Sequence, residues 1–230
     1  MKRIKRLVAI LLLAVLLFAL SACSGSNESV FGVTAPTTPL EDAVSDGSTL
    51  SDSETPAAYR NDYFGYQCVL PSDWYVLNAD EVDQVIGVTK DAVGEGDAGD
   101  IIKKSLESGT STMDFYALSG SGTQTINIVL GKGTFLERFL SEAQLLAAST
   151  PLLTSALENM GATNITSTSV KITLLGEEHA ALRVQGDYQG VSLDELLCMV
   201  RKGAYLSTIT ITDMTGNPTE DALAYFQTID

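Results

Sequence analysis

The stretch VKITLLGEEHAALRVQGDYQGVSLDELLCMVRKGAYLSTITIT, residues 170–212, decides the fold of this chain. Apolar and polar residues alternate along it, which is the pattern of strands that bury one face. Gly176, Gly190 and Gly203 interrupt the alternation at the spacing of hairpin turns. Consecutive hairpins pair antiparallel, so the stretch predicts an antiparallel meander. The residues expected on its buried faces are Val170, Ile172 and Leu174, then Ala180, Leu182 and Val184, then Leu196, Cys198 and Val200, and last Tyr205, Ile209 and Ile211.

Outside the meander, the sequence predicts further strands and helices. Alternating apolar residues over 113–117 and 126–130 predict a hairpin. Leucines at helical spacing over 141–160 predict the main helix, and Thr150-Pro151 predicts a kink or break within it. The remaining expected elements are strands over 63–70 and 74–77, helices over 78–88 and 101–107, and a final helix over 219–227, with Asn78 and Thr219 as the expected N-caps. This order predicts a layered α+β fold around an antiparallel sheet.

The first residues have the order of an export signal. A basic segment over 2–6 precedes an apolar run over 7–20, and small residues lead to Cys23. The run is shorter than the ~20 residues that a membrane-spanning helix needs. Leu20-Ser21-Ala22-Cys23 resembles a bacterial lipobox, which implies cleavage before Cys23 and lipid, palmitate included, on the new N-terminal cysteine. An ordinary signal peptide that contains a cysteine is the alternative. The expected location is the outer face of the bacterial cytoplasmic membrane.

Composition divides the chain into three parts. Residues 1–22 are the expected signal peptide. Residues 23–58 are rich in Ser, Thr, Asp, Glu and Pro and contain no Lys or Arg, so they predict a disordered acidic tether. Residues 59–230 predict a single domain, because a segment of this length buries one hydrophobic core.

The chain is strongly acidic, with 14 Lys and Arg against 29 Asp and Glu and a net charge of −15. Four of the basic residues and none of the acidic ones lie in residues 1–22, so cleavage leaves 10 basic residues against 29 acidic ones, a net charge of −19. Such a body repels nucleic acids and anionic lipid headgroups. The sequence therefore excludes nucleic acid as a partner and leaves the lipid on Cys23 as the contact with the membrane.

Two further cysteines, Cys68 and Cys198, lie in strand-like segments. An exported setting permits a disulfide between them, and burial as two free thiols is the alternative. Without a histidine partner they do not predict a zinc site.

Short motifs connect this chain to a known group of domains. Tyr63-Phe64-Gly65-Tyr66 is followed by Leu70-Pro71-Ser72-Asp73-Trp74, an extended strand that enters a P-x-x-W corner. Lys202-Gly203-Ala204-Tyr205 and Ile209-Thr210-Ile211-Thr212 precede the expected final helix. With the order of elements, these motifs make residues 59–230 resemble the PsbP-like superfamily, which includes bacterial lipoproteins. The resemblance implies an antiparallel sheet sandwiched between helices. It implies no catalytic set, and the better-known members bind or scaffold other proteins.

An acidic loop is the candidate for cation binding. Asp91, Glu95, Asp97 and Asp100 supply oxygen ligands of the kind that calcium prefers, but their spacing does not match an EF-hand, so a solvated loop is the default interpretation. The glycines over 94–99 match a dinucleotide fingerprint in letters only, since the acidic neighbours repel a pyrophosphate and the sheet is antiparallel. No metal and no cofactor is therefore expected.

Aromatic residues near the start of the domain are the candidates for ligand binding. Tyr63, Tyr66, Trp74 and Tyr75 combine apolar rings with polar tips, which suits a binding groove. The alternative is a sheet edge packed beneath a helix. His179 is the only histidine, and no nucleophile elbow accompanies it, so a hydrolase triad is not expected.

These observations predict a non-enzymatic lipoprotein at the cell surface that binds a ligand or supports an envelope protein. The alternative is an extracellular hydrolase that uses carboxylates on a cell-wall or secreted substrate. A buried pair of carboxylates in a deep cleft favours the hydrolase, whereas a shallow apolar surface favours the binding module. A transporter-linked substrate-binding lipoprotein is a third hypothesis, but it normally needs two lobes.

Overall fold

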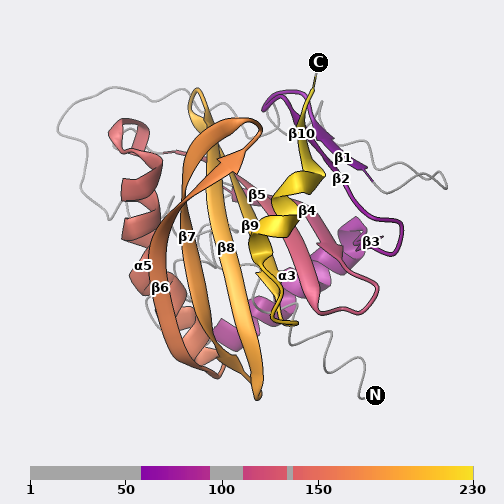
Figure 1. Cartoon of the computed structure of the whole chain (residues 1–230), viewed down its shortest axis with the longest axis vertical. Coiled ribbons are helices and arrows are strands. Elements are labelled where there is room, and N and C mark those ends of the chain that lie inside the picture. Colours follow the sequence, from indigo (N-terminus) through magenta and orange to yellow (C-terminus); the bar gives the residue numbers. More distant parts are fainter. Residues whose placement is uncertain (1–57, 94–110, 134–136, 230) are drawn as a thin grey trace.

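A seven-stranded antiparallel sheet forms the centre of the molecule, with the strand order β3-β4-β5-β9-β8-β7-β6. Figure 1 shows the computed structural model, which describes residues 58–93, 111–133 and 137–229. The strands are β3 (Tyr75–Val76), β4 (Ser111–Leu118), β5 (Gln124–Lys132), β6 (Ala162–Leu174), β7 (Glu177–Tyr188), β8 (Val191–Lys202) and β9 (Tyr205–Asp213). The predicted α+β fold with an antiparallel sheet is confirmed.

The meander β6-β7-β8-β9 turns where the glycines predicted it. Leu175 and Gly176 both have positive φ, 54° and 83°, and so do Gln189 and Gly190, 51° and 79°. Two successive residues of positive φ match the right-handed twist of adjoining strands, which is why glycine is favoured in such turns. Each hairpin therefore pairs in the register that the alternation requires.

Two helices cover one face of this sheet, the rear face in Figure 1. They are α3 (Ala79–Val93) and α5 (Glu142–Asn159), and a short 3-10 helix, η2 (Glu137–Phe139), precedes α5. The apolar side of α5 packs into the core on this face through five residues, Leu145, Leu146, Leu153, Ala156 and Leu157. In the part of the chain that the structure describes, no helix has the length and hydropathy of a membrane span.

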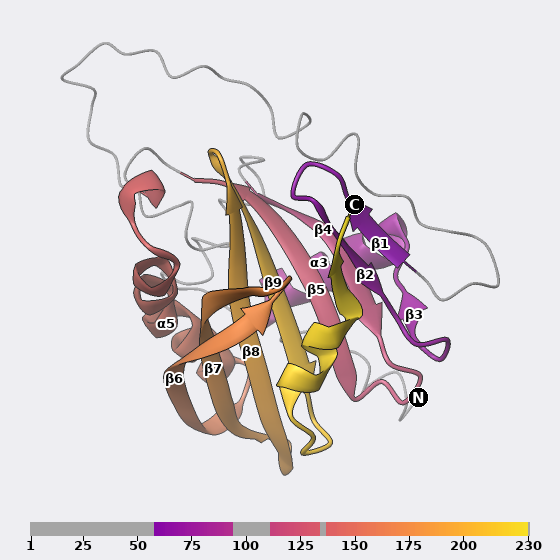
Figure 2. The same cartoon turned by 45° about the horizontal axis from the view of Figure 1, so that its top comes forward.

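A small sheet and a 3-10 helix cover the opposite face (Figure 2). The small sheet has the order β1-β2-β10, with β1 (Ala58–Asn61), β2 (Tyr66–Val69) and β10 (Phe226–Thr228), and the 3-10 helix is η3 (Thr219–Tyr225). This layer completes a second core that contains Tyr66, Leu70, Phe115 and Ile209. The large sheet is thus buried on both faces, by helices on one side and by mixed elements on the other.

The ends of several elements differ from the sequence prediction. The expected final helix is the shorter 3-10 helix η3, because from Phe226 onward the chain pairs with β2. Its N-cap is Pro218, not Thr219, and it has no side-chain cap hydrogen bond. The expected strand over 63–70 is shortened to β2, because the chain turns at Gly65, whose φ is 81°.

The two long helices, α3 and α5, also differ in part from the sequence prediction. Asn78 caps α3 as predicted, since it exchanges hydrogen bonds with Glu81 at 2.9 and 3.1 Å. The helix then continues past the expected end at residue 88 to Val93. The break expected at Pro151 is absent, and α5 runs unbroken through that proline. The helix expected over 101–107 lies outside the described residues.

A buried polar network fixes β1 to the large sheet. The Tyr59 hydroxyl donates to Asp114 at 2.5 Å and accepts from the Asn61 amide at 3.0 Å. Burial raises the pKa of the Asp114 carboxyl, while hydrogen bonding to that carboxyl from Tyr59 and Asn61 acts in the opposite direction. Cys68 and Cys198 are free, buried thiols in the second core, so the disulfide is absent and the alternative of two buried thiols is correct.

Candidate functional site

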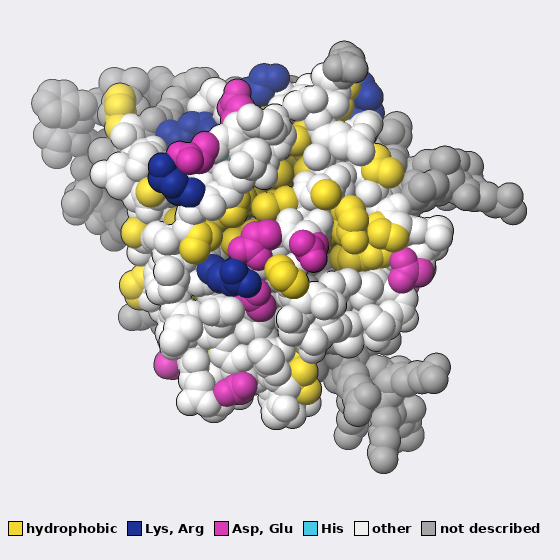
Figure 3. All heavy atoms as spheres, viewed as in Figure 1, with side chains coloured by type: hydrophobic (Ala, Val, Ile, Leu, Met, Phe, Trp, Pro, Cys, Tyr) yellow, Lys and Arg dark blue, Asp and Glu magenta, His cyan; other side chains and the backbone are white. Residues whose placement is uncertain are grey.

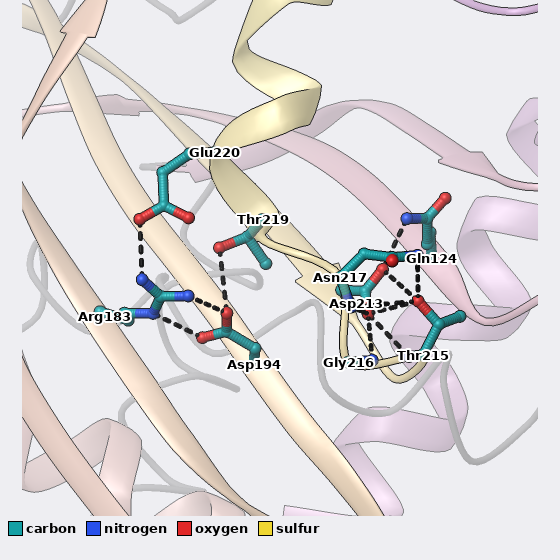
Figure 4. Close-up of polar contacts among 9 residues, drawn as sticks. All are labelled: Gln124, Arg183, Asp194, Asp213, Thr215, Gly216, Asn217, Thr219 and Glu220. Carbon is teal, nitrogen blue, oxygen red and sulfur yellow. Dashed lines mark hydrogen bonds and ion pairs between the residues drawn. The ribbon is translucent and has the colours of Figure 1, made fainter.

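A turn built on Asp213 sets the path from β9 into η3. The Asp213 side chain is 2% exposed, and its Oδ1 accepts the backbone N–H groups of Thr215, Gly216 and Asn217 at 2.7, 2.9 and 3.2 Å. The Gln124 amide donates to Oδ2 at 2.5 Å. These bonds, drawn in Figure 4, fix the turn that begins the candidate site.

Arg183 holds η3 down on the sheet. Its guanidinium makes a two-pronged contact with Asp194 on the neighbouring strand β8, with Nε at 2.9 Å from Oδ1. Its Nη1 donates to Glu220 of η3 at 2.8 Å, and the Thr219 hydroxyl reaches Asp194 at 3.4 Å (Figure 4). Two carboxylates therefore share one arginine, and the hydrogen bond to Asp194 raises the pKa of Arg183 further.

An open groove of about 830 Å³ lies beside η3, between this helix, the end of β6 and β10. We call it the η3 groove. Its floor is apolar, with Ile172 and Phe226 nearly buried and Leu175 and Leu223 partly exposed. Polar residues stand at its rim, among them Lys171, Glu220 and Gln227. Figure 3 shows hydrophobic side chains gathered on this face on both sides of η3, with charged groups next to them.

Two strand edges line the η3 groove. β6 is the last strand of the large sheet and β10 is the last strand of the small sheet. Among the described residues each pairs with a neighbour on one side only, β6 with β7 and β10 with β2. Consecutive residues of both strands, 171–173 and 226–228, border the groove. An edge strand presents backbone N–H and C=O groups that can pair with an added strand.

A smaller hollow of about 310 Å³ lies on the other side of η3. Trp74 and Tyr225 line it and meet edge to face, with ring centroids 5.9 Å apart. Gln124 and Asp213 stand at its polar end, where they already bond to each other. η3 therefore has a depression on each flank.

The predicted aromatic residues do not meet in one site. Tyr66 is fully buried and bonds to Ser207 at 2.6 Å, so it belongs to the core. Tyr75 is 52% exposed and bonds to Glu81 at the start of α3. Tyr63 packs on Tyr205 with Lys202 over its ring, and only Trp74 lines a hollow.

Other predicted site residues fall largely outside the described part of the chain. Cys23, Glu95, Asp97 and Asp100 are not described, and of Asp91 only the backbone is, which lies in α3 and not in a loop. Within the described ranges, no group of three or more His, Cys, Asp or Glu side chains is placed to hold a metal ion. His179 contacts the Glu142 carboxylate, 3.2 Å from both oxygens, at the start of α5.

Sequence reasoning missed the residues that position η3. Arg183, Asp194 and Asp213 are charged positions inside alternating strand patterns, and such positions normally face water. Asp194 and Asp213 are 7% and 2% exposed, because Arg183 and Thr219 contact the first and the turn over 215–217, together with Gln124, encloses the second. The available signal was a lone arginine on a strand whose even-numbered neighbours are apolar.

Comparison with known proteins gives likeness in fold only. No family model and no curated protein matches the chain. It is structurally similar to cyanobacterial PsbP (CyanoP) from Synechocystis sp. PCC 6803, with a TM-score of 0.47 and 9% identity over 80% of this chain and 99% of that one. LpqN, described as involved in cell envelope biogenesis of Mycobacterium tuberculosis, matches with a TM-score of 0.38 and 9% identity over 85% of this chain and 100% of that one. A Bacteroides thetaiotaomicron structure matches with a TM-score of 0.38 and 14% identity over 77% of this chain and 50% of that one. Likenesses of this size carry no argument about function, which rests on the geometry described above.

Proposed function

We propose that this chain is a lipid-anchored envelope protein whose η3 groove binds an extended polypeptide segment of a partner protein. The observation that carries the proposal is the pairing of two strand edges with an apolar floor. A segment lying between β6 and β10 gains backbone hydrogen bonds from an edge and buries alternate side chains on Ile172, Leu223 and Phe226. This is the strand-addition mode of peptide recognition.

The net charge of this chain limits which partner segments can bind in the groove. The net charge of −15 disfavours an acidic segment, because like charges lower both the rate and the strength of association. The groove floor is apolar, so the segment carries apolar side chains at alternate positions. We infer a neutral or basic extended segment.

The carboxylates near the groove support binding over hydrolysis. Glu220 and Asp194 both engage Arg183, at 2.8 and 2.9 Å, so both carboxylates already take part in one ion-pair network. A hydrolase of the carboxylate type needs one carboxyl kept as an acid opposite a free carboxylate. The described residues of this groove therefore give no support to the alternative of a hydrolase.

Site-specific crosslinking tests the groove. A photo-crosslinking residue at the exposed position Gln227, which lines the groove, is expected to capture a protein in intact cells. Ala224→Arg, at an exposed position on the same groove, is expected to abolish that product by filling it. The matched control is Ala148→Arg, an exposed alanine on α5 at the opposite face. A crosslink that survives Ala224→Arg, or an equal yield from a probe at position 148, contradicts the proposal.

The anchor is tested separately. Cys23→Ala is expected to abolish acylation of the chain, and mass spectrometry of the wild-type protein is expected to find Cys23 as an acylated N-terminus. An unmodified N-terminus downstream of Cys23 contradicts the lipid anchor and leaves the groove proposal standing.

A further inference from the structure

The hollow of about 310 Å³ on the other flank of η3 has an aromatic corner. Trp74 and Tyr225 line it, and their ring planes stand 80° apart with the centroids separated by 5.9 Å. Both side chains are partly buried against the second core, so packing holds the two rings in place. The face of an aromatic ring carries partial negative charge. The corner is therefore a fixed wall that is apolar and electronegative at once.

Carboxylates surround this aromatic corner. Asp221 of η3 is exposed and lines the hollow, and Asp213 stands at its polar end, in the turn drawn in Figure 4. Burial raises the pKa of the Tyr225 hydroxyl, and the charges of Asp73 and Asp221 add to this rise, so both carboxylates lie near that hydroxyl. The described residues that line the hollow include no Lys, Arg or His. Its negative charge is therefore not balanced by a basic side chain of the lining.

These walls favour a cation over an anion or a metal ion. An anion would meet carboxylates without the basic groups that bind it. A metal ion such as calcium takes several oxygen ligands, whereas Asp213 is already bonded to its own turn and to Gln124. Within the described ranges, no group of three or more metal-ligating side chains is present.

An organic cation uses both features of the hollow. Its charge is attracted by the faces of the rings and by the carboxylates. A quaternary ammonium group donates no hydrogen bonds, so it tolerates walls that offer few acceptors. The aromatic corner continues into apolar lining at Pro218 and Ala222, which suits the methyl groups of such an ion.

We propose that this hollow binds a small organic cation of the quaternary ammonium class, with Trp74 and Tyr225 as its aromatic walls and Asp221 as its counter-ion. The volume of about 310 Å³ lies at the lower end of the range of about 300–1,000 Å³ that is typical of small-molecule pockets. The hollow and the η3 groove lie on opposite flanks of η3, so this inference does not rest on the function proposed for the groove.

Tryptophan fluorescence of the full chain tests the proposal, because Trp74 is the only tryptophan in the sequence. Choline is the probe, titrated at constant ionic strength. The control ligand is 3,3-dimethyl-1-butanol, which has nearly the same shape without the charge. The expected result is a saturable change in fluorescence with choline and none with the alcohol.

The quaternary ammonium group occurs on free small molecules and on lipid headgroups. A parallel titration with glycerophosphocholine separates the two sources. Weaker binding than that of choline indicates a free cation, because the carboxylates repel the phosphate. Equal or tighter binding indicates a lipid headgroup.

Substitutions assign the signal to the hollow. Asp221→Asn removes the counter-ion at an exposed position and is expected to raise the dissociation constant for choline about threefold or more. The matched control is Asp83→Asn, an exposed carboxylate of α3 on the opposite face, which is expected to leave it unchanged. Tyr225→Leu should raise it about fivefold or more, whereas Tyr225→Phe keeps the ring and should keep the affinity. Melting temperatures show whether each variant folds, and Asp221→Asn alone decides if Tyr225→Leu does not.

Three outcomes overturn the proposal. The first is the absence of a saturable change with choline. The second is an equal response to 3,3-dimethyl-1-butanol, which means that the hollow binds apolar molecules without regard to charge. The third is wild-type affinity for choline in Asp221→Asn or in folded Tyr225→Leu, which places the bound cation elsewhere.

Discussion

Glu195 shows what a single buried carboxyl does to the stability of this domain. It is 1% exposed, and burial raises its pKa from 4.5 to about 8. Between these two pH values the folded protein holds a proton that the unfolded chain has released. The free energy of unfolding therefore falls as the pH rises through this window. The stabilising effect is complete below the unfolded pKa and lost above the folded one.

Glu195→Gln is expected to remove this dependence. The wild-type protein should lose on the order of 3–5 kcal/mol between about pH 5 and about pH 9, and the variant should lose far less, because glutamine does not ionise. Urea unfolding at both pH values measures the difference. Glu158→Gln, at an exposed position of α5, is the control and should follow the wild type. Equal slopes in the wild type and Glu195→Gln would show that Glu195 ionises normally.

The ion pair of Arg183 is largely buried, whereas the ion pair of Lys171 lies at the surface. Arg183→Gln leaves Asp194, whose side chain is 10% exposed, beneath η3 without its cation. We expect a loss of about 2–4 kcal/mol in the free energy of unfolding. Lys171 and Glu178 are 74% and 66% exposed, so Lys171→Gln should cost about 0–1 kcal/mol. Urea denaturation of both variants measures the two losses in the free energy of unfolding. Equal losses would contradict the expected difference between the two ion pairs.

At the scale of elements, α5 combines a strong start with a weak middle. Ser141 and Gln144 form a capping box, with bonds of 2.8 and 3.2 Å. Pro151, at an exposed position, lacks the N–H that the helix interior uses. The Ser149 and Thr150 hydroxyls both donate to the Leu146 carbonyl, at 2.8 and 2.9 Å, in the turn before it. Packing of the leucine face therefore carries the helix through a residue that local propensity rejects.

Opposite signs are expected for two substitutions in α5. Ser141→Ala should destabilise the domain by about 1 kcal/mol, because it removes the cap. Pro151→Ala should stabilise it by about 1 kcal/mol or more, because it restores a helix hydrogen bond and alanine favours helix. Thermal unfolding with helix content followed by circular dichroism measures both. A loss of stability in Pro151→Ala would mean that the proline ring itself contributes packing.

Elements built from neighbouring residues were predictable from the sequence, and those built from distant residues were not. The meander follows from glycine turns and alternation within one segment. The small sheet joins Tyr66 to Thr228, and no local pattern reports such a pairing. η3 ends where that same pairing begins, so the final helix was predicted too long.

Burial on both faces of the sheet explains the missed polar residues. Thr208, Thr210 and Thr212 alternate with Ile209 and Ile211, which is the pattern of a strand with one wet face. In the structure all five are buried, because α3 and α5 cover the threonine face. Whether a polar face meets water is decided by the layer placed over it, and alternation alone does not contain that information.

At the scale of the whole molecule, the two core thiols report on global unfolding. Cys68 and Cys198 lie at 0% exposure, and burial raises the pKa of each to about 12. A thiol reagent at neutral pH should therefore leave both unlabelled in the native protein, since the thiolate is the reactive form. In denaturant both should react.

The number of thiols that react in denaturant also tests the anchor. The full sequence has three cysteines, so protein from the membrane fraction should yield two reactive thiols if Cys23 carries lipid, and three if Cys23 is retained without lipid. Cys23→Ala should yield two in either case. Native labelling of Cys68 or Cys198 would contradict the buried positions described here.

The strand that closes the small sheet, β10, is made among the last residues of the domain, while its partner β2 is made among the first. A ribosome must therefore finish almost the whole domain before β2 acquires that neighbour, and η3 settles over the large sheet only then. Until that moment the nascent polypeptide lacks one of the two layers that cover the large sheet, so the domain is not yet stably folded. Such a delay is compatible with the proposed export, in which the chain would cross a membrane before it folds.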